Sequence, residues 1–296
     1  MIQRVLIGTD FSETSDAALQ WGVEISRAHG AEVMLVHALR LPSFVTPYVP
    51  VPPDIDVELE RKALDRLTEI ERRVADGGTK VTTAIRHDDP ASALRDAALE
   101  GNADLVVVGT RGQSRLEHLL LGSVAERVIS IVPVPVLAVH PEDFDRHRPL
   151  RRVLVPTDFS AEARRSAQVA LDLIGARGKG ELILVHAYHM PVEYAAYGAL
   201  PVNWNFVEEA SRAAKSELGK WAAELSASGW KVTTETAEGP PALVIERLAK
   251  EREVDLIAMG THGRSGLREL VLGSVAKRVV QHAPCPVLTV RRQSKD

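Results

Sequence analysis

Hydrophobic positions along the chain follow two patterns that predict two kinds of element. Short apolar runs, such as VLIG at 5–8 and LVVVG at 105–109, are typical of parallel strands buried on both faces. Between these runs lie longer segments in which apolar residues are spaced as on one face of a helix. The alternation predicts repeated βαβ units, and therefore an α/β fold with helices on both faces of a parallel sheet.

The pattern predicts five strands in each half of the chain. In the first half we expect strands near 4–9, 32–38, 79–86, 104–109 and 134–139, and helices near 14–29, 56–75, 91–100 and 123–131. In the second half we expect strands near 152–157, 181–187, 230–237, 255–260 and 286–291. Ser12 and Ser160 stand where N-caps belong, and Pro90 and Pro241 stand where a first helical turn tolerates a missing N–H.

The two halves are copies of one unit. RVLIGTDFS at 4–12 returns as RVLVPTDFS at 152–160, and DLVVVGTRG at 104–112 returns as DLIAMGTHG at 255–263. Because the motifs keep their order, the chain is predicted to be a tandem duplication. The polar segment HPEDFDRHRPL at 140–150 lacks apolar periodicity and marks the linker. We therefore expect one domain at 1–146 and a second at 147–296.

The last predicted strand of each half contains prolines, in PVPVLAV at 133–139 and PCPVLTV at 284–290. Such a strand belongs at a sheet edge, because a central strand cannot lack N–H donors. Pairing of the two last strands across a pseudo-twofold axis would bury both edges. We therefore expect an intrachain pseudo-dimer, and whether two chains associate further is left open.

Composition excludes several classes of protein. The chain has 36 Lys and Arg against 40 Asp and Glu, a net charge of −4, and no basic stripe of the kind that nucleic-acid binders carry. Cys285 is the only cysteine, which rules out an intrachain disulfide and fits a reducing compartment. No signal-peptide pattern and no apolar run long enough to span a membrane is present, so we expect a cytoplasmic protein without a membrane partner.

The candidate site is a repeated frame of glycines, GTRGQSRLEHLLLGS at 109–123 and GTHGRSGLRELVLGS at 260–274. In the common strand order 3-2-1-4-5 the ligand crevice lies between the ends of strands one and four. Strand one ends at Thr9 and Asp10, with copies at Thr157 and Asp158, and strand four ends where each frame begins. The motifs therefore converge on one crevice in each half.

The frame contains two features that favour phosphate. Its first two glycines, Gly109 with Gly112 and Gly260 with Gly263, can adopt positive φ and admit a ligand against bare backbone. Its last two residues, Gly122-Ser123 and Gly273-Ser274, open a helix whose free N–H groups attract an anion. Alternatively, the glycines only shape a turn and cap a helix, since a duplication copies structural glycines as well.

Other polar residues have structural interpretations beside functional ones. Asp10 and Asp158 are also suited to capping the helices that follow, and His37 and His186 suit packed strand ends. Arg111 and its counterpart His262 are within reach of phosphates but differ between the halves. Neither GxxxxGK[ST] nor GxGxxG after the first strand occurs, which disfavours P-loop nucleotidases and dinucleotide dehydrogenases.

The glycine frame, the TDFS strand end and LVHA together resemble the ATP-binding branch of the universal stress protein family, over nearly the whole of both halves. The resemblance implies two tandem Rossmann-like domains of the adenine nucleotide alpha hydrolase type, each with a five-stranded sheet that holds ATP, with Mg²⁺ as its usual companion. It places nucleotide contacts at the following residues: Thr9, Asp10, Ala38, Gly109, Gly112, Gly122, Ser123 and Val124, and Thr157, Asp158, Ala187, Gly260, Gly263, Gly273, Ser274 and Val275.

The expected function is therefore that of an ATP-binding regulator or sensor of the stress response. A slow ATPase or phosphotransferase is the first alternative, although no catalytic residue and no dedicated metal site can be named. A nucleotide-free interaction scaffold is the second. Asp88 and Asp89 stand where the other half has Gly239 and Pro240, and they either repel a polyphosphate or help hold a metal ion. If Asp88 and Asp89 repel a polyphosphate, the two sites differ in their affinity for ATP.

Overall fold

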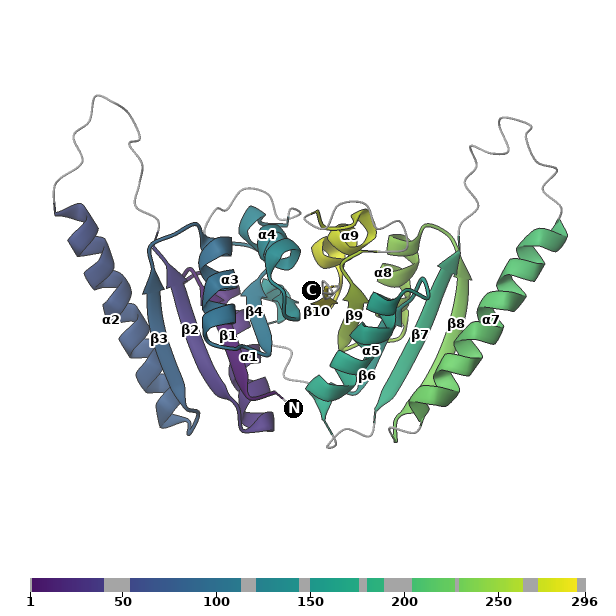
Figure 1. Cartoon of the computed structure of the whole chain (residues 1–296), viewed down its shortest axis with the longest axis horizontal. Coiled ribbons are helices and arrows are strands. Elements are labelled where there is room, and N and C mark those ends of the chain that lie inside the picture. Colours follow the sequence, from purple (N-terminus) through teal and green to yellow (C-terminus); the bar gives the residue numbers. More distant parts are fainter. Residues whose placement is uncertain are drawn as a thin grey trace, which may run out of the picture. The chain divides into compact units, whose positions relative to one another are not determined.

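The computed structural model describes residues 2–39, 54–112, 121–143, 150–175, 180–188, 204–226, 229–262 and 271–291. The chain forms two compact units (Figure 1), unit 1 mainly from residues 1–146 and unit 2 mainly from residues 147–292. The boundary that we expect between 146 and 147 falls in 144–149, outside the described residues. Two long connections, 40–53 and 189–203, also lie outside the described residues. So does the interior of each glycine frame, at 113–120 and 263–270.

Unit 1 alternates strands and helices along the chain. Its described elements are β1 (Arg4–Thr9), α1 (Glu13–His29), β2 (Glu32–Ala38), α2 (Ile55–Asp76), β3 (Val81–Arg86), α3 (Pro90–Glu100), β4 (Leu105–Gly109), α4 (Ser123–Ile131), β5 (Val136–Val139) and the 3₁₀ turn η1 (Pro141–Asp143). The strands are parallel and ordered β3-β2-β1-β4-β5. The order reverses between β1 and β4.

Unit 2 repeats this arrangement. Its described elements are β6 (Arg152–Pro156), α5 (Ala161–Ile174), β7 (Glu181–Tyr188), α7 (Trp204–Ser226), β8 (Lys231–Glu238), α8 (Pro241–Glu251), β9 (Leu256–Gly260), α9 (Ser274–His282) and β10 (Val287–Val290). The parallel order is β8-β7-β6-β9-β10, with the reversal between β6 and β9. The predicted α/β class with two tandem domains is confirmed.

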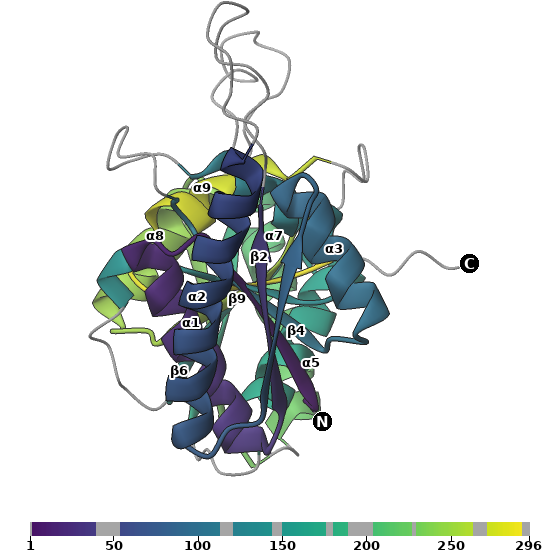
Figure 2. The ribbon, with the colours of Figure 1, turned by 90° about the vertical axis from the view of Figure 1, so that its left-hand side faces the viewer.

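The apolar runs form the buried centre of each sheet. In β1 the side chains of Val5, Leu6 and Ile7 are fully buried, and the β4 partners Val106 and Val107 are buried equally. Helices cover both faces, which is why these strands do not alternate with polar residues. Figure 2 shows α1 and α2 on one side of the unit 1 sheet and α3 on the other.

Prolines shorten the last strand of each sheet. β5 begins at Val136, two residues later than expected from 134, because Pro135 has no N–H and contributes only its carbonyl, which accepts from Val106 N at 3.0 Å. The carbonyl of Pro286 serves Ile257 N in the same way at 3.1 Å. β5 and β10 are the terminal strands of their own units, and the pseudo-dimer remains a prediction.

An aspartate in each unit fixes the start of the first strand. Asp104 Oδ2 accepts from the backbone N–H of Gln3 at 2.7 Å and of Arg4 at 3.0 Å. In unit 2, Asp255 Oδ2 accepts from Arg151 and Arg152 at 2.9 and 2.8 Å. This clamp holds the start of β1 beside β4 and the start of β6 beside β9.

Two further expectations concern the cysteine and membrane-spanning helices. Cys285, the sole cysteine, is a buried side chain with 1% exposure, as expected for a packed residue. Among the helices that the structure describes, none combines the length and apolar character needed to cross a bilayer.

Candidate functional site

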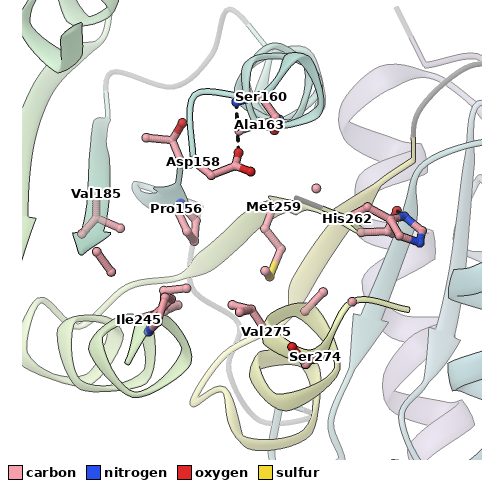
Figure 3. Close-up of a pocket in the computed structure, with 17 residues that line it drawn as sticks. Pro156, Asp158, Ser160, Ala163, Val185, Ile245, Met259, His262, Ser274 and Val275 are labelled. Atoms are coloured by element: carbon pink, nitrogen blue, oxygen red, sulfur yellow. Dashed lines mark hydrogen bonds between the residues drawn. The ribbon is translucent and has the colours of Figure 1, made fainter. Parts of the chain in front are cut away.

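A cavity lies at the carboxyl ends of the strands in each unit, at the reversal of strand order. In unit 2 it has a volume of about 250 Å³, and in unit 1 about 180 Å³. Figure 3 shows the unit 2 cavity with Asp158 on one side and with Ser274 and Val275 of α9 on the opposite side. Met259 of β9 lies between them. The topological switch therefore produces a hollow where such sheets place their ligands.

The site residues expected from the sequence line these cavities. In unit 1 they are Thr9, Asp10, Ala38, Gly109, Gly112, Gly122, Ser123 and Val124. In unit 2 they are Thr157, Asp158, Ala187, Gly260, Gly273, Ser274 and Val275. Gly263 lies outside the described residues.

The turn after the first strand fixes the aspartate of each site. Asp10 Oδ1 accepts from Ser12 N at 3.0 Å, and Asp158 Oδ1 accepts from Ser160 N at 3.0 Å (Figure 3). The helices are capped by the serines, since Ser12 Oγ accepts from Ser15 N and Ser160 Oγ from Ala163 N. The expected capping serines are thus confirmed, and the aspartates brace the turn instead of capping the helix.

A phenylalanine in a left-handed conformation completes this turn. Phe11 has φ of 62° and Phe159 has φ of 65°, values that cost a non-glycine residue about 1–2 kcal/mol. Each backbone N–H is held by the preceding threonine, with Phe11 N donating to Thr9 Oγ1 at 3.1 Å and Phe159 N to Thr157 Oγ1 at 2.8 Å. Strain that recurs at the same place in both units marks a site whose geometry is over-determined.

The strand-end histidines support the same turn. His37 Nδ1 donates to Thr9 O at 2.8 Å, and its ring lies 4.4 Å from that of Phe11. His186 Nδ1 donates to Thr157 O at 2.7 Å, and its ring lies 4.7 Å from that of Phe159. Burial lowers the pKa of His37, partly opposed by the hydrogen bond to Thr9 and the charge of Asp10. The structural interpretation of these histidines is confirmed.

The glycines at the ends of β4 and β9 are required for packing. Gly109, Gly112 and Gly260 all lie in the described residues, and none of them has positive φ. The expectation that these frame glycines adopt positive φ is therefore wrong for the three that can be checked. A Cβ on Gly109 would lie 2.6 Å from Thr14 Cγ2, and one on Gly260 would lie 2.9 Å from Glu162 Cβ. These glycines let the first turn of α1 or α5 approach the strand end. At Gly112 a Cβ would instead meet the site aspartate, 2.9 Å from Asp10 Oδ2.

The glycine-serine pairs begin helices without a side-chain cap. Gly122 and Gly273 are the N-caps of α4 and α9, and neither N-cap makes a side-chain capping hydrogen bond. Each glycine donates its N–H to a threonine carbonyl, Thr110 O at 2.8 Å or Thr261 O at 3.0 Å. The first-turn N–H groups of a helix have no intrahelical partners. The uncapped ends of α4 and α9 therefore present donors and a positive dipole end to the cavities.

Sequence reasoning missed the apolar floor of each cavity. Leu94 of α3 and Ile245 of α8 line it, together with Val108 of β4 or Met259 of β9. Their signal was present as the apolar fifth residue of a helix that begins with proline. Leu94 also explains Gly8, because a Cβ there would lie 2.8 Å from Leu94 Cδ1.

The charged candidates have other partners. Asp89 caps α3 through Ser92 N and pairs with Arg127 Nη1 at 3.1 Å. Arg111 Nη1 lies 3.3 Å from Glu142 Oε1, and His262 Nδ1 lies 3.0 Å from Thr261 Oγ1. In Figure 3 the His262 ring points away from Asp158 and Met259. Arg111 and His262 therefore line the cavity walls while each also interacts with a neighbouring side chain.

Comparison with known proteins agrees with the duplicated fold. The sequence profile of the Universal stress protein family matches residues 1–140 and again residues 149–291. The chain belongs to this family. Each unit of this universal stress protein thus carries one match, with the cavity residues inside it.

Relatives match this chain over nearly their whole length. A universal stress protein of Mycolicibacterium smegmatis is 31% identical, covering 97% of this chain and 96% of its own length. One from Mycobacterium tuberculosis is 28% identical over 97% of both chains. The crystal structure of a universal stress protein from Archaeoglobus fulgidus matches with a TM-score of 0.73 at 24% identity, covering 98% of each chain, which supports the fold.

Proposed function

We propose that this universal stress protein binds an adenine nucleotide, ATP in the first instance, in the cavity of each unit and acts as a nucleotide-dependent regulator of the stress response. The observation that carries the proposal is the uncapped N-terminus of α4 and of α9, each opening onto a cavity beside the aspartate of the first strand. An anion is the ligand that such a helix end favours.

The cavity chemistry divides the ligand into an apolar and an anionic part. Leu94 or Ile245 and the strand residues Val36 or Val185 offer a flat apolar contact for a base. Ala38 and Ala187, at the ends of the second strands, are placed for main-chain contacts with its edge. Volumes of about 180 and 250 Å³ are below the roughly 300–1,000 Å³ of pockets that enclose whole ligands. The cavity is therefore suited to the nucleoside, with the phosphates along its mouth.

Polar groups at the mouth suit ribose and phosphate. The carboxylates of Asp10 and Asp158 line the cavities and would accept from the ribose hydroxyls, since an ionised carboxylate has about four acceptor positions. Gly112 leaves the space beside Asp10 free of a Cβ. The hydroxyls of Ser123 and Ser274 and the first-turn N–H groups would hold the phosphates, with Mg²⁺ bound chiefly by phosphate oxygens. No step of bond cleavage is assigned to any residue, and binding is the proposed function.

Nucleotide release from purified protein tests the proposal. The protein is denatured, released nucleotide is quantified by chromatography, and the measurement is repeated on dialysed protein refilled with Mg-ATP. We expect two adenine nucleotides per chain after refilling. The matched variants Ser123→Glu and Ser274→Glu should each remove one of them. Absence of nucleotide both as purified and after refilling would overturn the proposal and favour the scaffold.

The same samples separate a sensor from an enzyme. If ATP hydrolysis continues at the same rate in a double variant that carries both Ser123→Glu and Ser274→Glu, the released phosphate does not come from these cavities. A turnover rate well below about one per minute that is lost in the double variant fits a binding protein, since enzymes typically reach about 1–1,000 s⁻¹.

A further inference from the structure

The two cavities differ in the charge of the helix ends that flank them. In unit 1 the first turn of α1 carries Glu13 and Asp16, and the first turn of α4 carries Glu126. In unit 2 the first turn of α5 carries one acid, Glu162, and that of α9 carries none. The duplication makes this a matched comparison, because the same helices begin at the same places in both units.

Charge is inverted at two corresponding positions. Asp16 of α1 corresponds to Arg164 of α5, and Glu126 of α4 corresponds to Lys277 of α9. Each inversion lies within a turn of the helix end that borders the cavity. A charge at this position acts directly on the helix end, where an acid offsets the positive dipole that an anion needs and a base reinforces it.

The acids of unit 1 also act on one another. Asp16 has its pKa raised by burial and by the nearby carboxylates of Asp10 and Glu13, while Arg73 opposes the shift. In unit 2, Arg164 lies 5.2 Å over the ring of Trp221 and pairs with Glu224 at 3.0 Å, so this carboxylate offsets much of its positive charge and Lys277 is the main added cation.

The α3 and α8 termini differ in the cap but little in net charge, because the acidic cap of α3 is ion-paired. Asp89 caps α3 next to Pro90, which lines the unit 1 cavity, and Arg127 is engaged with Asp89 at 3.1 Å. The corresponding cap in unit 2 is the uncharged Pro240, next to Pro241 of the cavity wall. The larger volume, about 250 against 180 Å³, is found on the less acidic side.

We propose that the two cavities are specialised by charge, so that unit 2 takes nucleoside polyphosphates while unit 1 prefers a nucleoside monophosphate, with Lys277 and Glu126 as specificity determinants. The inference rests on the proposed function and assigns a different ligand class to each site. It follows from the opposite charge at two pairs of positions that otherwise share one fold.

Each site is measured alone by isothermal titration. Ser123→Glu leaves the unit 2 cavity available, and Ser274→Glu leaves that of unit 1. Each protein is titrated with ATP, AMP and adenosine at low and moderate salt. We expect the ratio of ATP affinity to AMP affinity to be about 3- to 30-fold higher in unit 2 for each inverted charge pair, at about 0.3–1 kcal/mol per charge. The difference should shrink as salt is added.

Charge exchange then assigns the effect to residues. In the unit 2 protein, Lys277→Glu should weaken ATP about 3- to 30-fold, and in the unit 1 protein Glu126→Lys should strengthen it by a similar factor. Adenosine affinity should change less than about twofold in both, because adenosine carries no charge. Lys250→Glu, about 14 Å further along α8 from Pro241, is the matched control and should leave ATP affinity unchanged.

The outcomes separate the two proposals. Equal ATP-to-AMP ratios in the isolated units would overturn the specialisation while leaving nucleotide binding in place. If a charge exchange changes the affinity for adenosine as much as the affinity for ATP, Glu126 or Lys277 has a structural role. This result would also overturn the specialisation. Failure of both isolated units and of the wild type to bind any of the three ligands would overturn the proposed function itself.

Discussion

Replacing Ser274 by glutamate tests the helix-end mechanism without weakening the helix. Ser274 is the first residue of α9, is exposed and lines the unit 2 cavity. A carboxylate there would lie about 5 Å from a bound phosphate, which costs about 1 kcal/mol per charge pair in water and about 3 kcal/mol at a protein surface. The same carboxylate stabilises α9 by about 0.3–1 kcal/mol through the dipole. Binding should therefore fall while stability rises.

The magnitude is isolated by a neutral control of the same size. Ser274→Gln removes the hydroxyl but adds no charge, so the difference between the Glu and Gln variants is the electrostatic part. We expect it to be about 5- to 150-fold in the Kd for ATP, from about 1–3 kcal/mol, measured by isothermal titration in the Ser123→Glu background. Thermal unfolding of both variants should show the Glu variant at least as stable. Equal ATP affinities for the Glu and Gln variants would refute the assignment of phosphate to the α9 terminus.

Three further predictions concern the residues that shape the site. Gly260→Ala places a Cβ 2.9 Å from Glu162 Cβ and should lower the free energy of urea unfolding by about 1–3 kcal/mol. The control Gly219→Ala in α7 has no atom within 4 Å of the new Cβ and should be neutral or stabilising. A larger loss of stability in Gly219→Ala than in Gly260→Ala would be inconsistent with a packing role for Gly260. Phe159→Gly should be about 1 kcal/mol more stable than Phe159→Ala, because only glycine adopts φ of 65° without strain, and an equally stable alanine variant would argue against strain. Burial lowers the pKa of His37 below 6.5, so the unfolded chain binds the proton first and stability is lost as the pH falls below that value. Wild type should therefore lose more free energy of unfolding than His37→Gln between about pH 7.5 and about pH 5.5. Parallel losses in the two proteins would contradict this.

The sequence predicted the fold well because its strongest signals are local and repeated. Buried strands such as Val5–Ile7 are apolar without interruption, and the capping serines stand directly before their helices. Strand ends were less accurate where proline removes a donor, as at Pro135. The convergence of Asp10 with the glycine frame followed from strand order, since the reversal point brings these segments together.

The role of individual site residues was harder to predict. Gly109 was expected to adopt positive φ, but the reason for glycine there is the closeness of Thr14, a tertiary contact that no local pattern reveals. Leu94 was missed for a similar reason, because an apolar residue on a helix has the same signal whether it faces a core or a cavity. The left-handed conformation of Phe11 also has no local signal, since phenylalanine rarely adopts it.

Under the proposed function, the glycine N-caps of α4 and α9 would make the stability of each unit depend on its ligand. A serine or aspartate cap would add about 1 kcal/mol, but a Cβ on Gly122 or Gly273 would lie 3.1 or 2.9 Å from a threonine carbonyl. Under the proposed function the phosphate itself takes the place of the cap, so nucleotide at about 100 times its Kd would add about 2.7 kcal/mol to the stability of the unit that binds it. Loss of the nucleotide would remove the same amount of stability and so raise the fraction of that unit that is unfolded.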